Sequence, residues 1–87
     1  MVPQPSRFDL TDQIAQEIDA VGLLCPLPIL RFKKRTHGLP AGSLVELVTD
    51  DPTGRKDLEA LCQITGHQLL DVMPHANGVI RYRVRLG

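Results

Sequence analysis

Cys25 and its neighbours are the residues in this sequence best suited to chemistry. They form the segment Asp19-Ala20-Val21-Gly22-Leu23-Leu24-Cys25-Pro26-Leu27-Pro28. Proline has a helical φ and lacks an N–H, so we expect a helix to begin at Pro26, with Pro28 tolerated in its first turn and Cys25 directly before it. Unpaired amides and the positive end of the helix dipole stabilise a thiolate there, and the thiolate is the nucleophile. The segment predicts a reactive thiol, the alternative being a buried structural cysteine.

The length and composition indicate one small domain with balanced charge. The 87 residues include ten basic and ten acidic side chains, so no net charge attracts nucleic acid or an anionic membrane. No apolar run approaches the ~18 residues that span a bilayer, and the first residues lack the basic-then-apolar order of a secretory signal. Two cysteines do not form a disulfide framework, so we expect a protein of the reducing cytoplasm with no membrane partner.

Hydrophobic periodicity predicts four strands and two helices in the order βαβαββ. Residues 1–16 have weak apolar patterning, and we expect a loosely ordered arm there, followed by a single domain over 17–87. Strands alternate apolar and polar residues, whereas helices repeat apolar residues every three or four positions. The predicted strands are 17–21, 44–49, 68–73 and 79–86, and the predicted helices are 26–37 and about 52–65.

This order of elements predicts the architecture. A strand–helix–strand unit with short connections forms a right-handed crossover between parallel strands. Two helices are enough to cover one face of a four-stranded sheet. We therefore predict an α/β (α+β) two-layer sandwich, with a four-stranded mixed sheet and both helices on one face.

The last strand predicts a polar outer face for this sheet. Arg81, Arg83 and Arg85 alternate with apolar residues, and Glu46 and Asp71 point outward on their own strands. Ion pairs across the sheet explain these arginines. The alternative is an RNA-binding stripe, which the zero net charge and the lack of aromatic platforms disfavour. We expect no direct nucleic-acid partner.

The parallel crossover brings two loops to one edge of the sheet. Cys25 follows the first strand and Asp50-Asp51 follows the second, so the two segments should be neighbours where ligands of open α/β sheets bind. Asp51 is most simply the cap of a helix that begins at Pro52. The two carboxylates raise the pKa of a nearby thiol, in opposition to the helix amides and the lysines. The sequence leaves open which effect is larger.

The remaining cysteine and the histidines predict no further chemistry. Cys62 falls on the apolar face of the second helix, so we expect a buried hydrophobic residue rather than a resolving thiol. The positions of His37, His67 and His75 do not have the spacing of a zinc site. We predict no metal and no cofactor.

Lys33, Lys34 and Arg35 form a basic side of the first helix. They can steer an anionic donor or bind an acidic partner surface. They can equally be a solvated face whose cations complement the helix dipole. The sequence leaves both interpretations open.

The chain resembles the TusA/SirA-like family of small sulfur-carrier proteins. The resemblance covers residue 19 to the C-terminus and combines a Gly-Leu lead-in, a Cys-Pro-x-Pro motif, an Asp-Asp-Pro turn and a basic last strand. The residues that carry it are Asp19, Gly22, Leu23, Cys25, Pro26, Pro28, Lys33, Lys34, Asp50, Asp51, Pro52, Cys62, Gly66 and His67.

The resemblance implies a sulfurtransferase that carries sulfane sulfur as a persulfide on Cys25. It further implies two partners, namely a donor protein (a cysteine desulfurase or a rhodanese-like protein) and a downstream acceptor protein. Family members serve tRNA thiolation, cofactor sulfuration or sulfur oxidation. The residues expected to support the cysteine are Asp19, Gly22, Pro26, Pro28, Asp50 and Asp51.

Two functional hypotheses follow. In the first, Cys25 relays sulfur between proteins, which the absence of a nearby second cysteine favours over disulfide formation. In the second, the chain is a non-catalytic regulatory module that binds protein or RNA through its sheet face or its basic helix. An alkylation rate of Cys25 no faster than that of a model thiol would favour the module, as would salt-sensitive RNA binding through the arginines.

Overall fold

The computed structural model describes residues 14–87, so residues 1–13 of the predicted arm lie outside the described residues. The elements follow the predicted order βαβαββ, with one short 3-10 turn, η1, before the last strand. They are β1 (Ile14–Asp19), α2 (Leu27–Thr36), β2 (Leu44–Thr49), α3 (Gly54–Thr65), β3 (Gln68–Pro74), η1 (Ala76–Gly78) and β4 (Ile80–Arg85).

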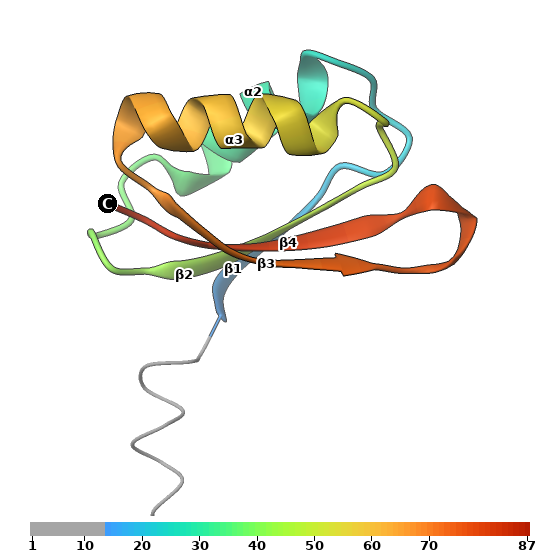
Figure 1. Ribbon diagram of the computed structural model, residues 1–87. Helices are drawn as coiled ribbons and strands as arrows, with labels where there is room; N and C mark the ends of the chain where they lie inside the picture. Colours follow the sequence, from blue (N-terminus) through green and yellow to red (C-terminus); the bar gives the residue numbers. More distant parts are fainter. Residues whose placement is uncertain (1–13) are drawn as a thin grey trace, which may run out of the picture.

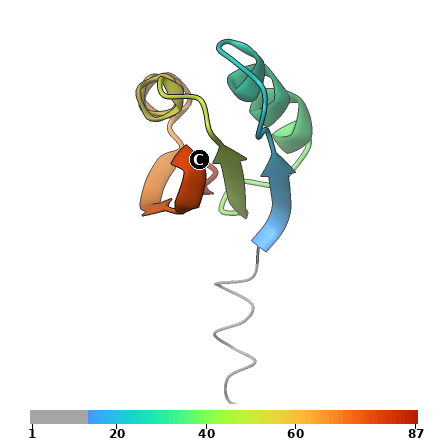
Figure 2. The same ribbon diagram turned by 90° about the vertical axis from the view of Figure 1, so that its right-hand side faces the viewer.

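The strands form one mixed sheet in the order β1-β2-β4-β3. β1 and β2 are parallel, whereas β4 runs antiparallel to β2 and to β3. Both helices lie on the same face of this sheet (Figure 1). Figure 2 shows α2 on the side of β1 and α3 on the side of β3 and β4. The predicted two-layer sandwich is confirmed.

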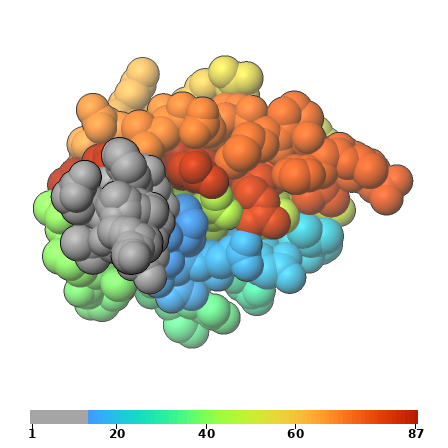
Figure 3. Space-filling model, turned by 90° about the horizontal axis from the view of Figure 1, so that it is seen from below, coloured from blue at the N-terminus to red at the C-terminus, as the bar shows by residue number. Residues whose placement is uncertain are grey.

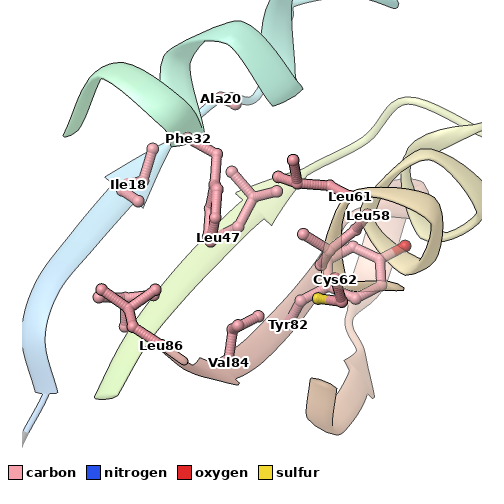
Figure 4. Packing of buried hydrophobic residues seen from close by; sticks show 11 residues of the cluster. Ile18, Ala20, Phe32, Leu47, Leu58, Leu61, Cys62, Tyr82, Val84 and Leu86 are labelled. Carbon is pink, nitrogen blue, oxygen red and sulfur yellow. The ribbon is translucent and has the colours of Figure 1, made fainter. Parts of the chain in front are cut away.

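The core fills the space between the sheet and the two helices (Figure 4). Its largest side chains are those of Tyr82 on β4 and Phe32 on α2, both fully buried. Cys62 on α3 is buried among them, as predicted. The cluster comprises Ile18, Ala20, Phe32, Val45, Leu47, Leu58, Leu61, Cys62, Tyr82, Val84 and Leu86.

The first strand differs from its prediction at both ends. It begins at Ile14 rather than at residue 17, because Ile14 and Gln16 already pair with β2. The register shifts between these two residues, but burial still alternates along β1, and the polar Gln16 occupies a partly buried position where the pattern calls for an apolar residue. The strand ends at Asp19, because the Leu23 N–H donates to the Ala20 carbonyl and turns the chain.

Ion pairs link the strands on the face of the sheet opposite α2 and α3, which is the side of the molecule seen in Figure 3. Glu46 on β2 is only 5% exposed and accepts hydrogen bonds from Arg81 and Arg83 of β4, each at 2.7 Å. Arg81 also pairs with Glu17 of β1. The prediction for Glu46 is therefore confirmed, and the paired arginines favour a structural role over RNA binding.

Asp71 was predicted to share in this network, and that prediction is wrong. It lies opposite Arg83 in the register of β3 and β4 but forms no ion pair with any residue over 14–87. Arg83 instead directs Nε and Nη2 of its guanidinium to Glu46. Asp71 is left exposed to solvent.

Candidate functional site

The loop that carries Cys25 is tied to the loop after β2, as the sequence predicts. The Gly22 N–H donates to Asp50 Oδ1 at 2.9 Å, across the sheet edge where both loops lie (Figure 1). Gly22 has φ +87°, a conformation that other residues adopt at a cost. Asp19 supports the same loop, because its Oδ1 accepts from the Val21 N–H and its carbonyl accepts from Arg31.

The helix after Cys25 begins one residue later than predicted. Pro26 is the N-cap of α2, with non-helical φ −98° and ψ 14°, and Leu27 is the first helical residue. The peptide bond between Cys25 and Pro26 is cis. Pro26 and Pro28 have no N–H, and the Leu27 N–H donates to the Leu24 carbonyl at 2.8 Å. The N-terminus of α2 therefore offers Cys25 fewer free amides than the sequence suggested.

Asp51 caps a turn rather than a helix, which corrects a second prediction. Its carbonyl accepts from the Gly54 N–H at 3.0 Å, and its Oδ1 accepts from the Thr53 N–H and the Thr53 hydroxyl, both at 3.0 Å. Aspartate first, proline second and glycine fourth is a favoured composition for a β-turn. Pro52 therefore occupies the turn, and α3 begins only at Gly54.

Cys25 lies beside two carboxylates from the other loop and from α3. Its Sγ and one carboxylate oxygen each from Asp51 and Asp57 lie within 4.8 Å of one another. We call these three residues the thiol–carboxylate cluster. Cys25 is exposed, whereas Asp51 is only 5% exposed. Asp51 Oδ2 is buried and has no hydrogen-bond partner within the described part of the chain.

The carboxylates raise the pKa of the Cys25 thiol above its ordinary value. The largest cause is the hydrogen bond that the protonated thiol makes to Asp57, followed by partial desolvation and by the negative charge of Asp57. The Thr53 hydroxyl acts in the opposite direction, and the charge of Asp51 adds to the increase. The net direction, which the sequence left open, is thus a raised pKa caused mainly by the acidic groups.

Sequence reasoning missed Asp57 and Thr53. Asp57 lies in the first turn of α3, at the sheet edge where the Asp50-Asp51 loop ends. Thr53 connects the two acids, because its hydroxyl lies 3.0 Å from Asp51 Oδ1 and 3.3 Å from Asp57 Oδ2. The available signal was the topology, since a helix that starts at this edge places its first turn there.

Exposed apolar side chains flank Cys25 along the loop and the first turns of α2. Leu24 is 66% exposed and Leu30 is 51% exposed. Leu27 and Leu30 line the same groove, and exposed apolar side chains that lie close together are typical of a surface that binds another molecule. We call this surface the leucine patch, and it consists of Val21, Leu24, Leu27 and Leu30.

Part of the basic side of α2 borders this patch. A shallow groove on α2 is lined by Leu23, Leu27, Leu30, Arg31, Lys34 and Arg35. Lys34 and Arg35 thus lie beside apolar surface, whereas Lys33 does not line the groove. Among residues 14–87, none of the three cations forms an ion pair with Asp51 or Asp57.

The histidines do not gather around the thiol. His67 is partly buried against Phe32, and its Nδ1 accepts from the Gly87 N–H at 2.9 Å. Burial lowers the pKa of His67. His37 and His75 are exposed. The absence of a metal site was predicted from histidine spacing alone, and that reasoning did not consider a group built from cysteine and carboxylates.

The fold and the cluster define a class of protein: a small α/β domain that presents an accessible thiol at one edge of its sheet. The family model described as "Sulfurtransferase TusA" matches residues 16–86. The chain belongs to this family, and the resemblance drawn from its motif is confirmed. Over residues 14–87, no helix has the length and apolar character needed to cross a membrane.

Individual relatives agree with the family match. The chain is 41% identical over 54 residues to "Sulfur carrier protein TusA" of Pseudomonas syringae. The aligned residues make up 62% of this chain and 64% of that protein. It is 43% identical over 56 residues to the protein of that name from Allochromatium vinosum, covering 64% and 74%. The match to the Pseudomonas putida F1 protein is 35% identical over 68 residues, covering 78% and 84%.

A solved structure confirms the fold independently of these sequences. The crystal structure of a SirA-like protein from Desulfitobacterium hafniense superimposes with a TM-score of 0.72 at 30% sequence identity. The superposition covers 83% of this chain and 97% of that one. The chain is thus similar to sulfur carriers in sequence and to a SirA-like protein in structure.

Proposed function

We propose that this protein accepts sulfane sulfur as a persulfide on Cys25 and delivers it to a partner protein. The observation that carries the proposal is the accessible Cys25 thiol beside the leucine patch, in a chain of the TusA family. A carrier must expose its sulfur to two successive partners, and an exposed thiol on a loop at a sheet edge meets that need. Cys62, the other cysteine, is buried in the core.

Loading is an exchange between sulfur atoms that needs no external oxidant. The Cys25 thiolate attacks the outer sulfur of a donor persulfide, which forms an S–S bond at Cys25 and breaks the S–S bond of the donor. The donor departs as a thiolate. Delivery repeats the step, because a nucleophile of the acceptor attacks the outer sulfur and Cys25 leaves as a thiolate.

The raised pKa means that the free protein holds most of this thiol protonated at neutral pH. Loading therefore depends on a basic or cationic group in the donor's active site, which takes the proton or stabilises the thiolate after docking. Slow alkylation of Cys25 by a small reagent is compatible with a carrier for this reason. Such slow alkylation consequently does not favour a binding module over a carrier.

The leucine patch and the neighbouring Lys34 and Arg35 support the proposal of protein partners. An apolar centre with a charged rim is the usual composition of a protein interface. We infer a donor of the cysteine desulfurase or rhodanese type and a separate acceptor, both in a reducing compartment such as the cytoplasm. The identity of the acceptor decides between tRNA thiolation, cofactor sulfuration and sulfur oxidation.

Mass spectrometry of the loaded protein tests the proposal. The protein is incubated with a cysteine desulfurase and cysteine, or with a thiosulfate-derived donor, and its intact mass is measured. We expect an addition of about 32 Da, one sulfur atom, that a reductant removes, because reduction cleaves a persulfide. Peptide mapping should place the added sulfur on the peptide that contains Cys25.

Two variants make the assignment specific. Cys25→Ser should not load, whereas Cys62→Ala, which removes the buried thiol, should load as the natural chain does. Loading of Cys25→Ser together with no loading of Cys62→Ala would show that the wrong cysteine has been assigned. No loading of the natural chain by either type of donor would refute the carrier function.

A further inference from the structure

We propose that the thiol–carboxylate cluster of Cys25, Asp51 and Asp57 is a binding site for one zinc ion. The three residues come from the β1–α2 loop, the β2–α3 loop and the first turn of α3. Each offers one ligand atom, and the three atoms lie within 4.8 Å of one another. Small side-chain adjustments bring such a set to the bond lengths of a tetrahedral ion, which are about 2.0–2.3 Å to oxygen and sulfur.

Asp51 provides independent support for a missing ligand. Its side chain is almost fully buried, and its Oδ1 is satisfied by the Thr53 N–H and hydroxyl. Its Oδ2 is buried without a hydrogen-bond donor among residues 14–87. A buried carboxylate oxygen without a partner costs free energy, and a metal ion is one group that removes this cost.

The charges of the cluster point to a cation. None of the ion pairs among the described residues includes Asp51 or Asp57. Two carboxylates therefore share a small volume with the thiol, and no lysine or arginine of residues 14–87 pairs with them. A divalent ion compensates this charge.

The donor atoms select the kind of ion. Magnesium and calcium prefer oxygen ligands alone, whereas zinc accepts sulfur and oxygen together. Three protein ligands leave a fourth position open to water, as in zinc sites that are not purely structural. When the ion binds, the Cys25 S–H releases its proton to solvent and a Zn–S bond forms.

Zinc at this site affects the proposed carrier function in a specific way. A thiolate bound to zinc is a weaker nucleophile than a free thiolate, because the cation withdraws electron density from the sulfur that must attack a donor persulfide. A bound ion therefore slows sulfur loading until it is removed, and it protects the thiol from oxidants in the meantime. This consequence rests on the proposed function, whereas the metal site itself does not.

Metal titration of the full-length, metal-free protein tests the site. Zn²⁺ is added in competition with a chromogenic chelator, and Co²⁺ is used as a spectroscopic substitute that shows a sulfur-to-metal charge-transfer band when cysteine is a ligand. We expect one Zn²⁺ per chain and a Co²⁺ spectrum that contains this band. Cys25→Ser should abolish the band, and Asp51→Asn and Asp57→Asn should each weaken Zn²⁺ binding about tenfold or more.

The controls separate this site from other binding and from misfolding. Cys62→Ala and Asp71→Asn, which remove a thiol and an acid elsewhere, should bind Zn²⁺ like the natural chain. Cys25 is exposed, so Cys25→Ser tests the site even if the Asp51 variant is unstable. Zinc binding that is absent, or unchanged by Cys25→Ser, would overturn the proposal. Persulfide loading is measured separately with a chelator present, so failure of zinc binding leaves the carrier function untouched.

Discussion

Asp57, a residue of α3, has the largest influence on the pKa of the Cys25 thiol. The hydrogen bond and the charge of Asp57 raise the pKa of the thiol. The opposing effect of α2 is limited because Pro26 and Pro28 lack the N–H groups that stabilise a thiolate. A side chain 32 positions away in the sequence thus sets the reactivity of Cys25 in the free protein.

Asp57→Asn is expected to make Cys25 more reactive. Removing the charge lowers the pKa of the thiol, so a larger fraction is thiolate at neutral pH. The rate of alkylation by iodoacetamide, measured from about pH 6 to 10 with a chelator present, should follow a profile shifted to lower pH. Asp71→Asn changes an exposed acid that is not part of the thiol–carboxylate cluster, so it should leave the pH profile unchanged. If the pH profile of Asp57→Asn were not shifted, Asp57 would not be the cause of the raised pKa of the Cys25 thiol.

The residues of the site could be predicted only in part. Cys25 was evident from its motif, and the proximity of Gly22 and Asp50 followed from the parallel crossover. Asp57 and Thr53 were missed because each has an ordinary local role in a helix or a turn. Their importance arises only from where the first turn of α3 sits relative to a loop far away in sequence.

At the scale of elements, Gly22 joins two loops that carry the site. Its positive φ directs its N–H toward Asp50, and this hydrogen bond spans 28 positions of the sequence. An added Cβ at Gly22 meets no atom within 4 Å, so substitution there is a test of backbone conformation without steric overlap. The loop geometry at Cys25 depends on this conformation.

Gly22→Ala should destabilise the protein by about 1–2 kcal/mol, the cost of a left-handed conformation for an ordinary residue. Gly22→Asn is the matched control and should cost less, because asparagine tolerates this conformation. Urea unfolding followed by circular dichroism measures both values. Equal costs for the two variants would show that the loop relaxes to another conformation, in which the hydrogen bond from Gly22 to Asp50 is broken.

The elements were more predictable than their ends. Repeats of two residues for strands and of three to four residues for helices identified, in order, the four strands and two α-helices of residues 14–87, because burial of one face imposes these repeats. The helix starts were wrong because proline occupies turns and caps as readily as the first helical position. Pro52 belongs to a turn closed by Asp51 and Gly54, and Pro26 is a cap.

At the scale of the whole molecule, one buried carboxylate connects three strands of the sheet. Glu46 on β2 pairs with Arg81 and Arg83 on β4, and Arg81 reaches Glu17 on β1. Burial acts to raise the pKa of Glu46, but the hydrogen bonds from Arg83 and Arg81 outweigh it, so the pKa is lowered. This network links the strands on the face of the sheet opposite α2 and α3.

The stability of the protein should therefore fall in acid in a way that depends on Glu46. A carboxyl group whose pKa is lowered by folding stabilises the native state above its unfolded pKa, and this stabilisation is lost as the pH falls through the folded pKa. Glu46→Gln should be less stable than the natural chain by about 1–2 kcal/mol at pH 7 and should lose less stability on acidification. Urea unfolding from about pH 7 to pH 3 measures this dependence.

Asp71→Asn is the matched control for this measurement, because Asp71 lies on the same face without an ion pair among the described residues. Its unfolding free energy should depend on pH as that of the natural chain does. If Glu46→Gln retained the full acid sensitivity, other carboxyl groups would have to account for it.

The two prolines beside Cys25 also determine how the site can be observed in solution. Of the four residues Cys25 to Pro28, only Cys25 and Leu27 contribute a signal to an amide-detected NMR spectrum, since proline has no amide proton. The Leu27 amide donates to the Leu24 carbonyl directly across the thiol-bearing turn. Its resonance is thus a natural reporter for sulfur, metal or a partner arriving at Cys25.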